Sequence, residues 1–343
     1  MKTFEWCVVG AGPAGIAVVG KLIDSGVKGK DILWIDPAFE VGDLGEKWRA
    51  VSSNTSVKLF LMYLKACKAF NFEDAPHFNL KELPSEKTCL LQEIAEPLMW
   101  VTDQLKQQVS SLQAEVSSLE MENGFWVLKT ESDVIQAKSV ILATGAEPRK
   151  LSFPNLKEIP LEKALVSSHL PDLTGETVAV FGSSHSAMIA VKNILESSAK
   201  KVINFYRSPL KFAVFFDDWT LFDNTGLKGE TATWVRQCIH GNCPDNLKRV
   251  LTSDTDFSKI LSQCQSVVYA VGFDQRVPPK AHQIGKLVYN QSNGIIAPGL
   301  FGLGIGFPQR VEDRYGNVES SVGLWKFMKY LEEILPLWEK YQL

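Results

Sequence analysis

The stretch Trp-Cys-Val-Val-Gly-Ala-Gly-Pro-Ala-Gly, residues 6–15, carries the clearest fold signal in this 343-residue chain. Residues 4–10 are mostly apolar and predict a buried strand, and the glycines that follow fit the spacing G-x-G-x-x-G. Gly10 permits a tight turn, Gly12 lets the backbone approach a pyrophosphate, and Gly15 lets helix and strand pack closely. The stretch therefore predicts the strand, turn and helix of a dinucleotide-binding unit.

The residues after this turn complete the unit. Pro13 suits the first helical position, because an N–H there would have no partner within the helix and proline has none. An apolar helix follows, and Gly26 can end it. Residues 31–36 predict a second strand that ends in Asp36, whose carboxylate can accept hydrogen bonds from an unphosphorylated ribose. Strand, glycines, helix, strand and acid in this order indicate a dinucleotide with an unphosphorylated ribose, and the contrast between Asp36 and Arg207 of the second motif assigns FAD to this turn. The alternative is a glycine-rich turn that packs a helix on a strand and binds nothing.

A second motif begins with an apolar strand at residues 177–182. It continues as a turn of pattern G-x-S-x-x-A, in which Ser184 and Ala187 replace two glycines and keep the turn small. After a helix, residues 201–206 predict another strand, with Arg207 just past its end. An arginine there favours a 2′-phosphate, because its planar fork bonds phosphate bidentately, so the motif predicts an NADPH site. The alternative for this arginine is ordinary solvated charge.

Two similar strand endings indicate the domain organisation. Residues 140–145 end an apolar strand in Ala-Thr-Gly, and a related sequence later ends in Ala-Val-Gly-Phe-Asp. Such strands suit the crossings between two domains. We therefore predict an α/β fold of two Rossmann-like three-layer domains, with the NADPH domain inserted into the FAD domain. The predicted FAD-binding domain is discontinuous, 1–155 and 268–343, and the predicted NADPH-binding domain is 156–267.

Composition argues against several classes of protein. A net charge of −3 without a long basic run argues against nucleic acid, because phosphate contacts need clustered Lys and Arg. Six scattered cysteines suggest no disulfide framework, and the apolar run at the N-terminus is too short to span a bilayer, so we expect a cytoplasmic protein without membrane contact. No histidine cluster with zinc spacing is present, and no metal is expected. A homodimer is a candidate assembly because two-fold dimers are common.

Three other segments allow alternative interpretations. Apolar residues spaced by three and four over 92–119 fit a coiled coil, but the turn and strand at 122–127 favour a shorter helix followed by strands. Cys238 and Cys243 have the spacing of a redox-active disulfide, and we interpret the pair as structural or incidental because it lies in an irregular stretch of the NADPH domain. The aromatic segment 212–234 fits either a substrate wall or packing between domains.

The order of the motifs resembles that of the flavin-containing monooxygenases, in the pyridine nucleotide-disulfide oxidoreductase superfamily. The segment Gly-Glu-Lys-Trp at 45–48 is similar to that family's Gly-Gly-x-Trp, and Ser-Asn-Thr-Ser at 53–56 is similar to its segment facing the flavin. The second turn, 182–187, is similar to its NADPH turn, and Ala-Val-Gly-Phe at 270–273 is similar to its later Ala-Thr-Gly-Tyr. The resemblance spans most of the chain.

The resemblance implies a reaction. In that family NADPH reduces FAD by hydride transfer, oxygen adds to the flavin C4a, and the hydroperoxide oxidises a nitrogen or sulfur atom of a small molecule. It implies that Asn54 hydrogen-bonds near the flavin and the nicotinamide as a catalytic residue; the alternative is an Asn in a turn. The chain departs from the family where Lys163 and Leu165 replace the Phe and Gly of Phe-x-Gly-x-x-x-His, and where Glu46 replaces a glycine. The glycine-rich stretch 302–306 stands where many flavoproteins have Gly-Asp.

We therefore predict an FAD- and NADPH-dependent oxidoreductase that acts on a small molecule and oxygen, with monooxygenation favoured. The alternatives are a flavin reductase or disulfide-reductase relative that passes electrons to another acceptor, and an FAD-binding redox sensor without turnover. The predicted FAD contacts are Gly10, Gly12, Pro13, Ala14, Gly15, Asp36, Pro37, Trp48, Ala143, Thr144, Gly145 and Gly304. The predicted NADPH contacts are Gly182, Ser183, Ser184, His185, Ser186, Ala187, Arg207 and Lys211.

Overall fold

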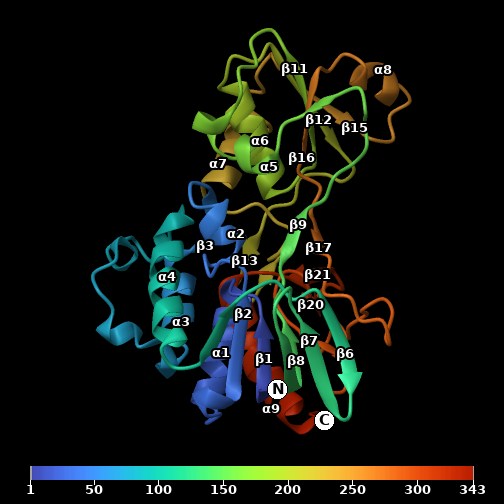
Figure 1. The fold of residues 1–343 in the computed structure, drawn as a ribbon. Helices are drawn as coiled ribbons and strands as arrows, with labels where there is room; N and C mark the ends of the chain where they lie inside the picture. The colour runs from blue at the N-terminus through green and yellow to red at the C-terminus, as the bar shows by residue number, and fades with distance from the viewer. Residues whose placement is uncertain (1, 343) are drawn as a thin grey trace. The chain divides into compact units, whose positions relative to one another are not determined.

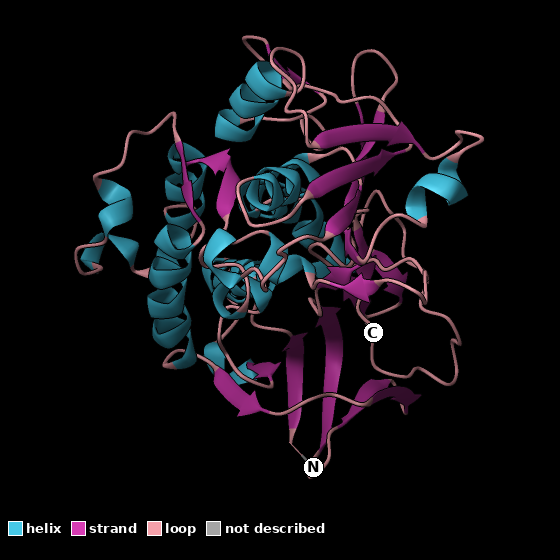
Figure 2. Cartoon of the chain, turned by 90° about the horizontal axis from the view of Figure 1, so that it is seen from above, coloured by secondary structure: helices cyan, strands magenta, loops and turns pink. Residues whose placement is uncertain are grey.

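The computed structural model describes residues 2–342, and the chain divides into two compact units (Figure 1). Unit 1 consists of Met1–Ala146, Gln275–Glu312 and Ser320–Leu343, and unit 2 consists of Glu147–Asp274 and Asp313–Glu319. Each unit has a sheet whose central strands are parallel, with helices packed on it, which agrees with the predicted α/β class; the sheet of unit 1 also has antiparallel pairs at its edges. In Figure 2 the helices are cyan and the strands magenta.

The helices and strands of each unit have the following bounds. The α-helices of unit 1 are α1 (Pro13–Asp24), α2 (Asp43–Glu46), α3 (Val57–Leu64), α4 (Gln92–Lys106) and α9 (Leu324–Lys340), and its short 3-10 turns are η1 (Gly29–Asp31), η2 (Lys68–Phe70), η3 (Phe72–Asp74) and η4 (Asn79–Lys81). Its strands are β1 (Thr3–Val9), β2 (Ile32–Asp36), β3 (Ser52–Ser56), β4 (Thr88–Leu90), β5 (Ser110–Gln113), β6 (Ser118–Glu122), β7 (Phe125–Lys129), β8 (Val134–Leu142), β18 (Ile295–Ala297), β19 (Leu300–Gly302) and β20 (Gln309–Glu312). Unit 2 contains α5 (Leu161–Ala164), η5 (Ser167–His169), α6 (His185–Leu195), α7 (Gly229–Cys238), α8 (Phe257–Leu261), β10 (Lys157–Glu158), β11 (Thr177–Phe181), β12 (Lys201–Tyr206), β13 (Val214–Phe215), β14 (Thr220–Leu221), β15 (Leu247–Leu251) and β16 (Ser266–Tyr269). The strands at the unit boundaries are β9 (Ala146–Pro148), β17 (Phe273–Gln275) and β21 (Val318–Ser321).

The unit boundaries differ from the predicted domain boundaries. Residues 147–155 and 268–274, which the sequence placed in the first domain, lie in unit 2. The reason is that β16 pairs in parallel with β10 and β11 inside the sheet of unit 2, so a boundary after residue 267 would cut a strand. The short segment 313–319 also belongs to unit 2, and its sequence carries no pattern that predicts this.

The main sheet of unit 1 has the order β18-β19-β8-β1-β2-β5. β1 lies between β2 and β8, and both pairings are parallel. Both β1 and β2 are mostly apolar and buried, which is typical of parallel strands covered on both faces. The carboxyl ends of β1, β2 and β8 meet at one edge of the sheet, and the first glycine turn starts there.

The two faces of this sheet are covered differently. Because successive side chains of a strand point to opposite faces, Trp6 and Val8 enter a core with α1, α3, α4 and α9, whereas Cys7 and Val9 enter a second core. The second core contains β6 and β7, an antiparallel pair that continues onto β8. The helix α4 ends before β5, β6 and β7, so the prediction of a shorter helix followed by strands is confirmed and the coiled-coil interpretation is wrong.

Unit 2 is a smaller parallel sheet of order β10-β16-β11-β12-β15. On one face the rings of Phe153, Phe181 and Phe205 stack in a row, with centroids 5.1 and 5.0 Å apart, and α8 packs there through Phe257. The other face contacts α6, whose apolar side covers β11 and β12. The strand predicted at residues 177–182, the turn and helix after it, and the strand predicted at 201–206 are thus confirmed, although the helix ends at Leu195 rather than near residue 198.

Candidate functional site

The first glycine turn is shaped by close backbone contacts that admit no side chain. A Cβ added at Gly10, whose φ is +112°, would lie 2.3 Å from the carbonyl oxygen of Ala143, and one added at Gly15 would lie 1.9 Å from that of Gly10. A Cβ at Gly12 would lie 3.9 Å from its nearest neighbour, the carbonyl oxygen of Val41. Two glycines therefore pack the turn, and the third leaves open space beside the backbone.

The start of α1 lies next to this open space. Gly12 is the N-cap residue and Pro13 opens the helix, and no side chain caps the first N–H groups or places an acid in the first turn. Uncapped N–H groups and the positive end of the helix dipole favour an anion here. The hydroxyl of Tyr63 donates a hydrogen bond to the carbonyl oxygen of Pro13, which links α3 to the start of α1.

Asp36 ties two loops of this site together. Its buried carboxylate accepts hydrogen bonds from three backbone N–H groups: Ala11 to Oδ2 at 2.6 Å, and Ala38 and Phe39 to Oδ1 at 2.9 and 2.7 Å. The loop after Asp36 is strained, since Phe39 and Val41 have φ of 58° and 61°. The ribose contact of this carboxylate stays a prediction, and the structure shows that the carboxylate ties the glycine turn to the loop after β2.

Two further segments close around the turn. Gly304, with φ of +94°, approaches so closely that a Cβ there would lie 2.6 Å from the Cβ of Ala14. A Cβ at Gly306 would lie 2.4 Å from the carbonyl oxygen of Gly145. Thr144 lies in the same loop, and its buried hydroxyl has no hydrogen-bond partner among the residues that the structure describes. The predicted contacts 10–15, 143–145 and 304 are therefore brought together.

The remaining predicted residues of the first site lie less deeply. Pro37 is exposed and Trp48 is half-buried just after α2. Asn54 is exposed on β3, and its Oδ1 accepts a hydrogen bond from the hydroxyl of Thr55 at 3.4 Å. Asn54 therefore lies in a strand rather than in the turn considered as the alternative.

The second glycine turn repeats the geometry of the first. Gly182 has φ of +125°, and a Cβ there would lie 2.2 Å from the carbonyl oxygen of Ala270 and 3.0 Å from the Cβ of Ala187. Ser184 is the N-cap of α6, and again no side chain caps the helix and no acid stands in its first turn. Ser183, His185 and Ser186 are half-buried around this start. Ala270 thus takes the same place beside Gly182 that Ala143 takes beside Gly10.

Positive side chains lie at the end of β12. Arg207 is exposed, and no carboxylate forms an ion pair with it within residues 2–342. Lys211 is also exposed and lies 4.5 Å above the ring of Phe222. Two polar residues that the sequence pattern did not single out are hydrogen-bonded to each other in the same sheet, Asn204 on β12 and Arg249 on β15. The signal for the first was a lone polar residue inside the apolar strand Lys-Val-Ile-Asn-Phe-Tyr.

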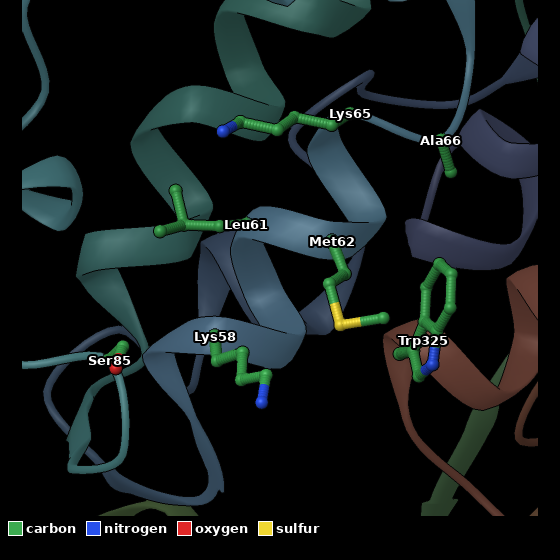
Figure 3. A pocket seen from close by; sticks show the side chains of 7 residues that line it. All are labelled: Lys58, Leu61, Met62, Lys65, Ala66, Ser85 and Trp325. Atoms are coloured by element: carbon green, nitrogen blue, oxygen red, sulfur yellow. The ribbon is translucent and has the colours of Figure 1, made fainter.

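A surface pocket of about 460 Å³ lies elsewhere in unit 1, on α3 (Figure 3). Met62 and Trp325 face each other across it, and Lys58 and Lys65 flank it. None of its lining residues is a predicted cofactor contact. The pocket is therefore not part of either predicted cofactor site.

Residues 2–342 contain neither a cluster of metal ligands nor a membrane-spanning helix. No group of three or more His, Cys, Asp or Glu side chains could hold a metal ion. No helix has the length and apolar character needed to cross a bilayer. The six cysteines, Cys238 and Cys243 among them, are free thiols. The assignment of particular residues to particular cofactors stays a prediction.

Comparison with known proteins places these features in context. Residues 7–213 match the family model described as pyridine nucleotide-disulphide oxidoreductase. The chain is 32% identical to a protein named monooxygenase AgnR1 of Paecilomyces divaricatus, over 96% of this chain and 97% of that protein. The family match includes both glycine turns, and the match to the relative extends over almost the whole chain.

Solved structures share the fold at low sequence identity. A flavin-containing monooxygenase from Stenotrophomonas maltophilia is 14% identical with a TM-score of 0.66, and the match covers 99% of each chain. A bacillithiol disulfide reductase from Staphylococcus aureus is 12% identical with a TM-score of 0.61, over 98% of this chain and 99% of that one. The predicted Rossmann-like fold with two units is thereby confirmed.

Proposed function

Because the chain belongs to the pyridine nucleotide-disulphide oxidoreductase family, we propose that this oxidoreductase is a monooxygenase that contains FAD, is reduced by NADPH and oxidises a nitrogen or sulfur atom of a small molecule. Membership makes it a flavin-dependent oxidoreductase. The choice of monooxygenation is supported by the relative that is named a monooxygenase and that matches almost the whole chain.

The residues of the first turn fit FAD. The open backbone at Gly12 and the uncapped start of α1 offer N–H groups to a pyrophosphate. The unpartnered hydroxyl of Thr144 is a buried polar atom that a ligand group would satisfy. Ala14 and Gly304 would close the turn from the opposite side. Asp36 keeps room for one ribose hydroxyl, because a carboxylate has about four acceptor sites and three are occupied.

The residues of the second turn fit NADPH. Gly182 packs against Ala270 as Gly10 packs against Ala143, and α6 begins without a cap, so residues 182–187 would hold the pyrophosphate. Arg207 and Lys211 would contact the 2′-phosphate, since Arg207 has no carboxylate partner in the part of the chain that the structure describes. FAD thus belongs to unit 1 and NADPH to unit 2.

The chemistry divides between cofactor and protein. FAD, when bound, supplies the acceptor for the hydride of NADPH and the reducing electrons with which dioxygen is activated. The overall balance is substrate, dioxygen, NADPH and a proton giving the oxygenated substrate, water and NADP⁺. The two turns bind and orient the cofactors, and Asn54 would donate its amide N–H to the reacting ends of both. Its exposed position on β3 leaves that amide accessible.

The observation that carries the proposal is the repeated turn: Gly10 against Ala143 in unit 1, and Gly182 against Ala270 in unit 2. In each unit this tight turn is followed directly by an uncapped helix start without an acid in its first turn, which suits a pyrophosphate. Asp36 at the end of β2 then favours a ribose with free hydroxyls, and Arg207 after β12 favours a ribose with a 2′-phosphate.

Stopped-flow spectroscopy with product analysis tests the proposal. The purified protein is reduced with NADPH without oxygen and mixed with labelled dioxygen and a simple alkyl aryl sulfide or tertiary amine. A monooxygenase transfers one labelled oxygen atom to the sulfur or nitrogen and delays the return of oxidised flavin absorbance. Immediate reoxidation with one hydrogen peroxide per NADPH, and no labelled product with either probe, would favour a reductase. No reduction by NADPH would indicate an FAD-binding protein without turnover.

A further inference from the structure

Asn204 is a fully buried amide in the middle of a strand. It lies on β12, between β11 and β15, where the neighbouring residues Val202, Ile203 and Phe205 are all apolar and buried. Burial of a side-chain amide costs free energy unless all its polar atoms are hydrogen-bonded. An apolar residue would fill this place in an ordinary parallel strand. The amide therefore needs a reason to be there.

The hydrogen bonds of Asn204 supply that reason. Its Nδ2 donates to the carbonyl oxygens of Val180 at 3.0 Å and Gly182 at 2.8 Å, and its Oδ1 accepts from Nε of Arg249 at 3.0 Å. Gly182 is the residue of φ +125° that starts the second turn. The amide thus fixes the backbone at the point where β11 becomes the turn.

Arg249 sets the orientation of this amide. Its Nε can only donate, so it requires the oxygen of Asn204 on its own side and directs Nδ2 toward Gly182. The guanidinium also lies 4.3 Å above the ring of Tyr206, the residue before Arg207. Its Nη2 is buried and has no hydrogen-bond partner within residues 2–342.

Burial of the Arg249 guanidinium at this position costs free energy. No carboxylate pairs with it in the described part of the chain, and burial lowers the pKa of Arg249 from its usual range. A cation held without a counter-ion does not stabilise the fold by ion pairing. The contacts that it does make lead to the turn, through Asn204, and to the end of β12, through Tyr206.

We propose that Asn204 and Arg249 form a positioning pair that holds the second glycine turn in the shape required for a dinucleotide pyrophosphate. The inference rests on the proposed function, in which this turn binds NADPH. The pyrophosphate is common to NADPH and NADH, so the pair supports the affinity for both. Arg207, in contrast, distinguishes between them by the 2′-phosphate.

Calorimetric titration of the flavin-loaded protein with NADP⁺ and with NAD⁺ tests the pair. Asn204→Asp keeps the contact with Arg249 but cannot donate to Gly182, and Arg249→Met keeps the packing on Tyr206 but loses the donor. We expect each variant to bind both nucleotides about tenfold more weakly, which corresponds to about 1.4 kcal/mol. Arg249→Lys retains a donor and should recover part of the affinity. Arg207→Ala is the matched control and should weaken NADP⁺ far more than NAD⁺.

Hydrogen exchange supplies a second readout that needs no nucleotide. Peptides that cover residues 182–187 should exchange faster in Arg249→Met, while those of unit 1 stay unchanged. Unchanged exchange in the turn, or wild-type affinity in Arg249→Met, would overturn the positioning role. If the wild type binds neither nucleotide, the proposed function fails, and the exchange measurement still decides whether the pair shapes the turn. Should Asn204→Asp fail to fold, Arg249→Met and Arg249→Lys decide alone.

Discussion

Replacing Asp36 with Asn tests how the first glycine turn is held. The carboxylate accepts three backbone N–H groups: Ala11 on Oδ2, and Ala38 and Phe39 on Oδ1. An Asn has one acceptor oxygen and one NH₂ group. Whichever way the amide turns, its NH₂ faces at least one of these N–H donors, so one or two contacts become repulsive.

The magnitude follows from these contacts. With the amide oxygen toward Ala38 and Phe39, the hydrogen bond from Ala11 at 2.6 Å is lost. A hydrogen bond to a charged acceptor contributes about 1.5–3 kcal/mol, and a buried N–H without an acceptor costs about 1–3 kcal/mol. Since the two effects overlap, we expect Asp36→Asn to lower the free energy of unfolding of unit 1 by about 3 kcal/mol. The FAD content of the purified protein should fall with it, because the loop at Ala11 leads into Gly12.

Urea unfolding followed by tryptophan fluorescence measures this change, since Trp6 and Trp34 are buried in unit 1. Asp172→Asn is the matched control, because Asp172 also accepts a backbone N–H, from Thr174 at 3.0 Å, but is exposed. The control should change stability by less than about 1 kcal/mol. A wild-type unfolding midpoint and full FAD content in Asp36→Asn would refute the idea that this carboxylate holds the turn.

Three further predictions concern the turns and the thiols. Arg207→Ala should raise the dissociation constant of NADPH by about 5- to 150-fold, for a loss of about 1–3 kcal/mol, and leave that of NADH nearly unchanged; equal losses in titration would contradict the 2′-phosphate assignment. Gly10→Ala should abolish FAD retention on gel filtration, because the new Cβ would lie 2.3 Å from the carbonyl oxygen of Ala143. Gly26→Ala is the control and should retain FAD, because Gly26 has a similar φ of +98° but no atom within 4 Å of the new Cβ. Loss of FAD in both variants would point to backbone strain alone. Burial raises the pKa of Cys89 from 9.0 to about 11, so iodoacetamide at about pH 8 should alkylate exposed Cys243 first, and the rate at Cys89 should rise toward pH 11. Mass spectrometry measures the two rates, and equal rates of alkylation at Cys89 and Cys243 would show that Cys89 is accessible. The raised pKa of Cys89 also lowers the free energy of unfolding at pH values above the pKa of the unfolded thiol, because the unfolded thiol ionises first.

Local patterns were sufficient to predict most of the two glycine turns. The spacing of Gly10, Gly12 and Gly15 after an apolar strand predicted a strand, turn and helix, because each requirement involves neighbours in the chain. The second turn followed in the same way, with Ser184 and Ala187 in place of glycines. The confirmed elements are those whose apolar periodicity and turn residues are close together in sequence.

The domain boundary was less predictable. The sequence Val-Val-Tyr before Ala270 has the composition of any buried parallel strand, and nothing in it tells which sheet it joins. The structure pairs β16 with β10 and β11 in unit 2, through residues more than a hundred positions apart at its outer edge. Strand pairing over that distance depends on which faces the helices leave open, and this is a property of the folded unit.

Residue order alone was enough to predict two strand–turn–helix motifs, with an acid after the first and an arginine after the second. The contacts that those residues make became known only from the folded chain. Asp36 turned out to accept three N–H groups from two loops, and Asn204 and Arg249 met across β12 and β15 to fix Gly182. The physical reason is that backbone conformation and burial follow from local residue order, whereas a hydrogen bond between residues about 25 or 45 positions apart exists only after the sheet has brought them together.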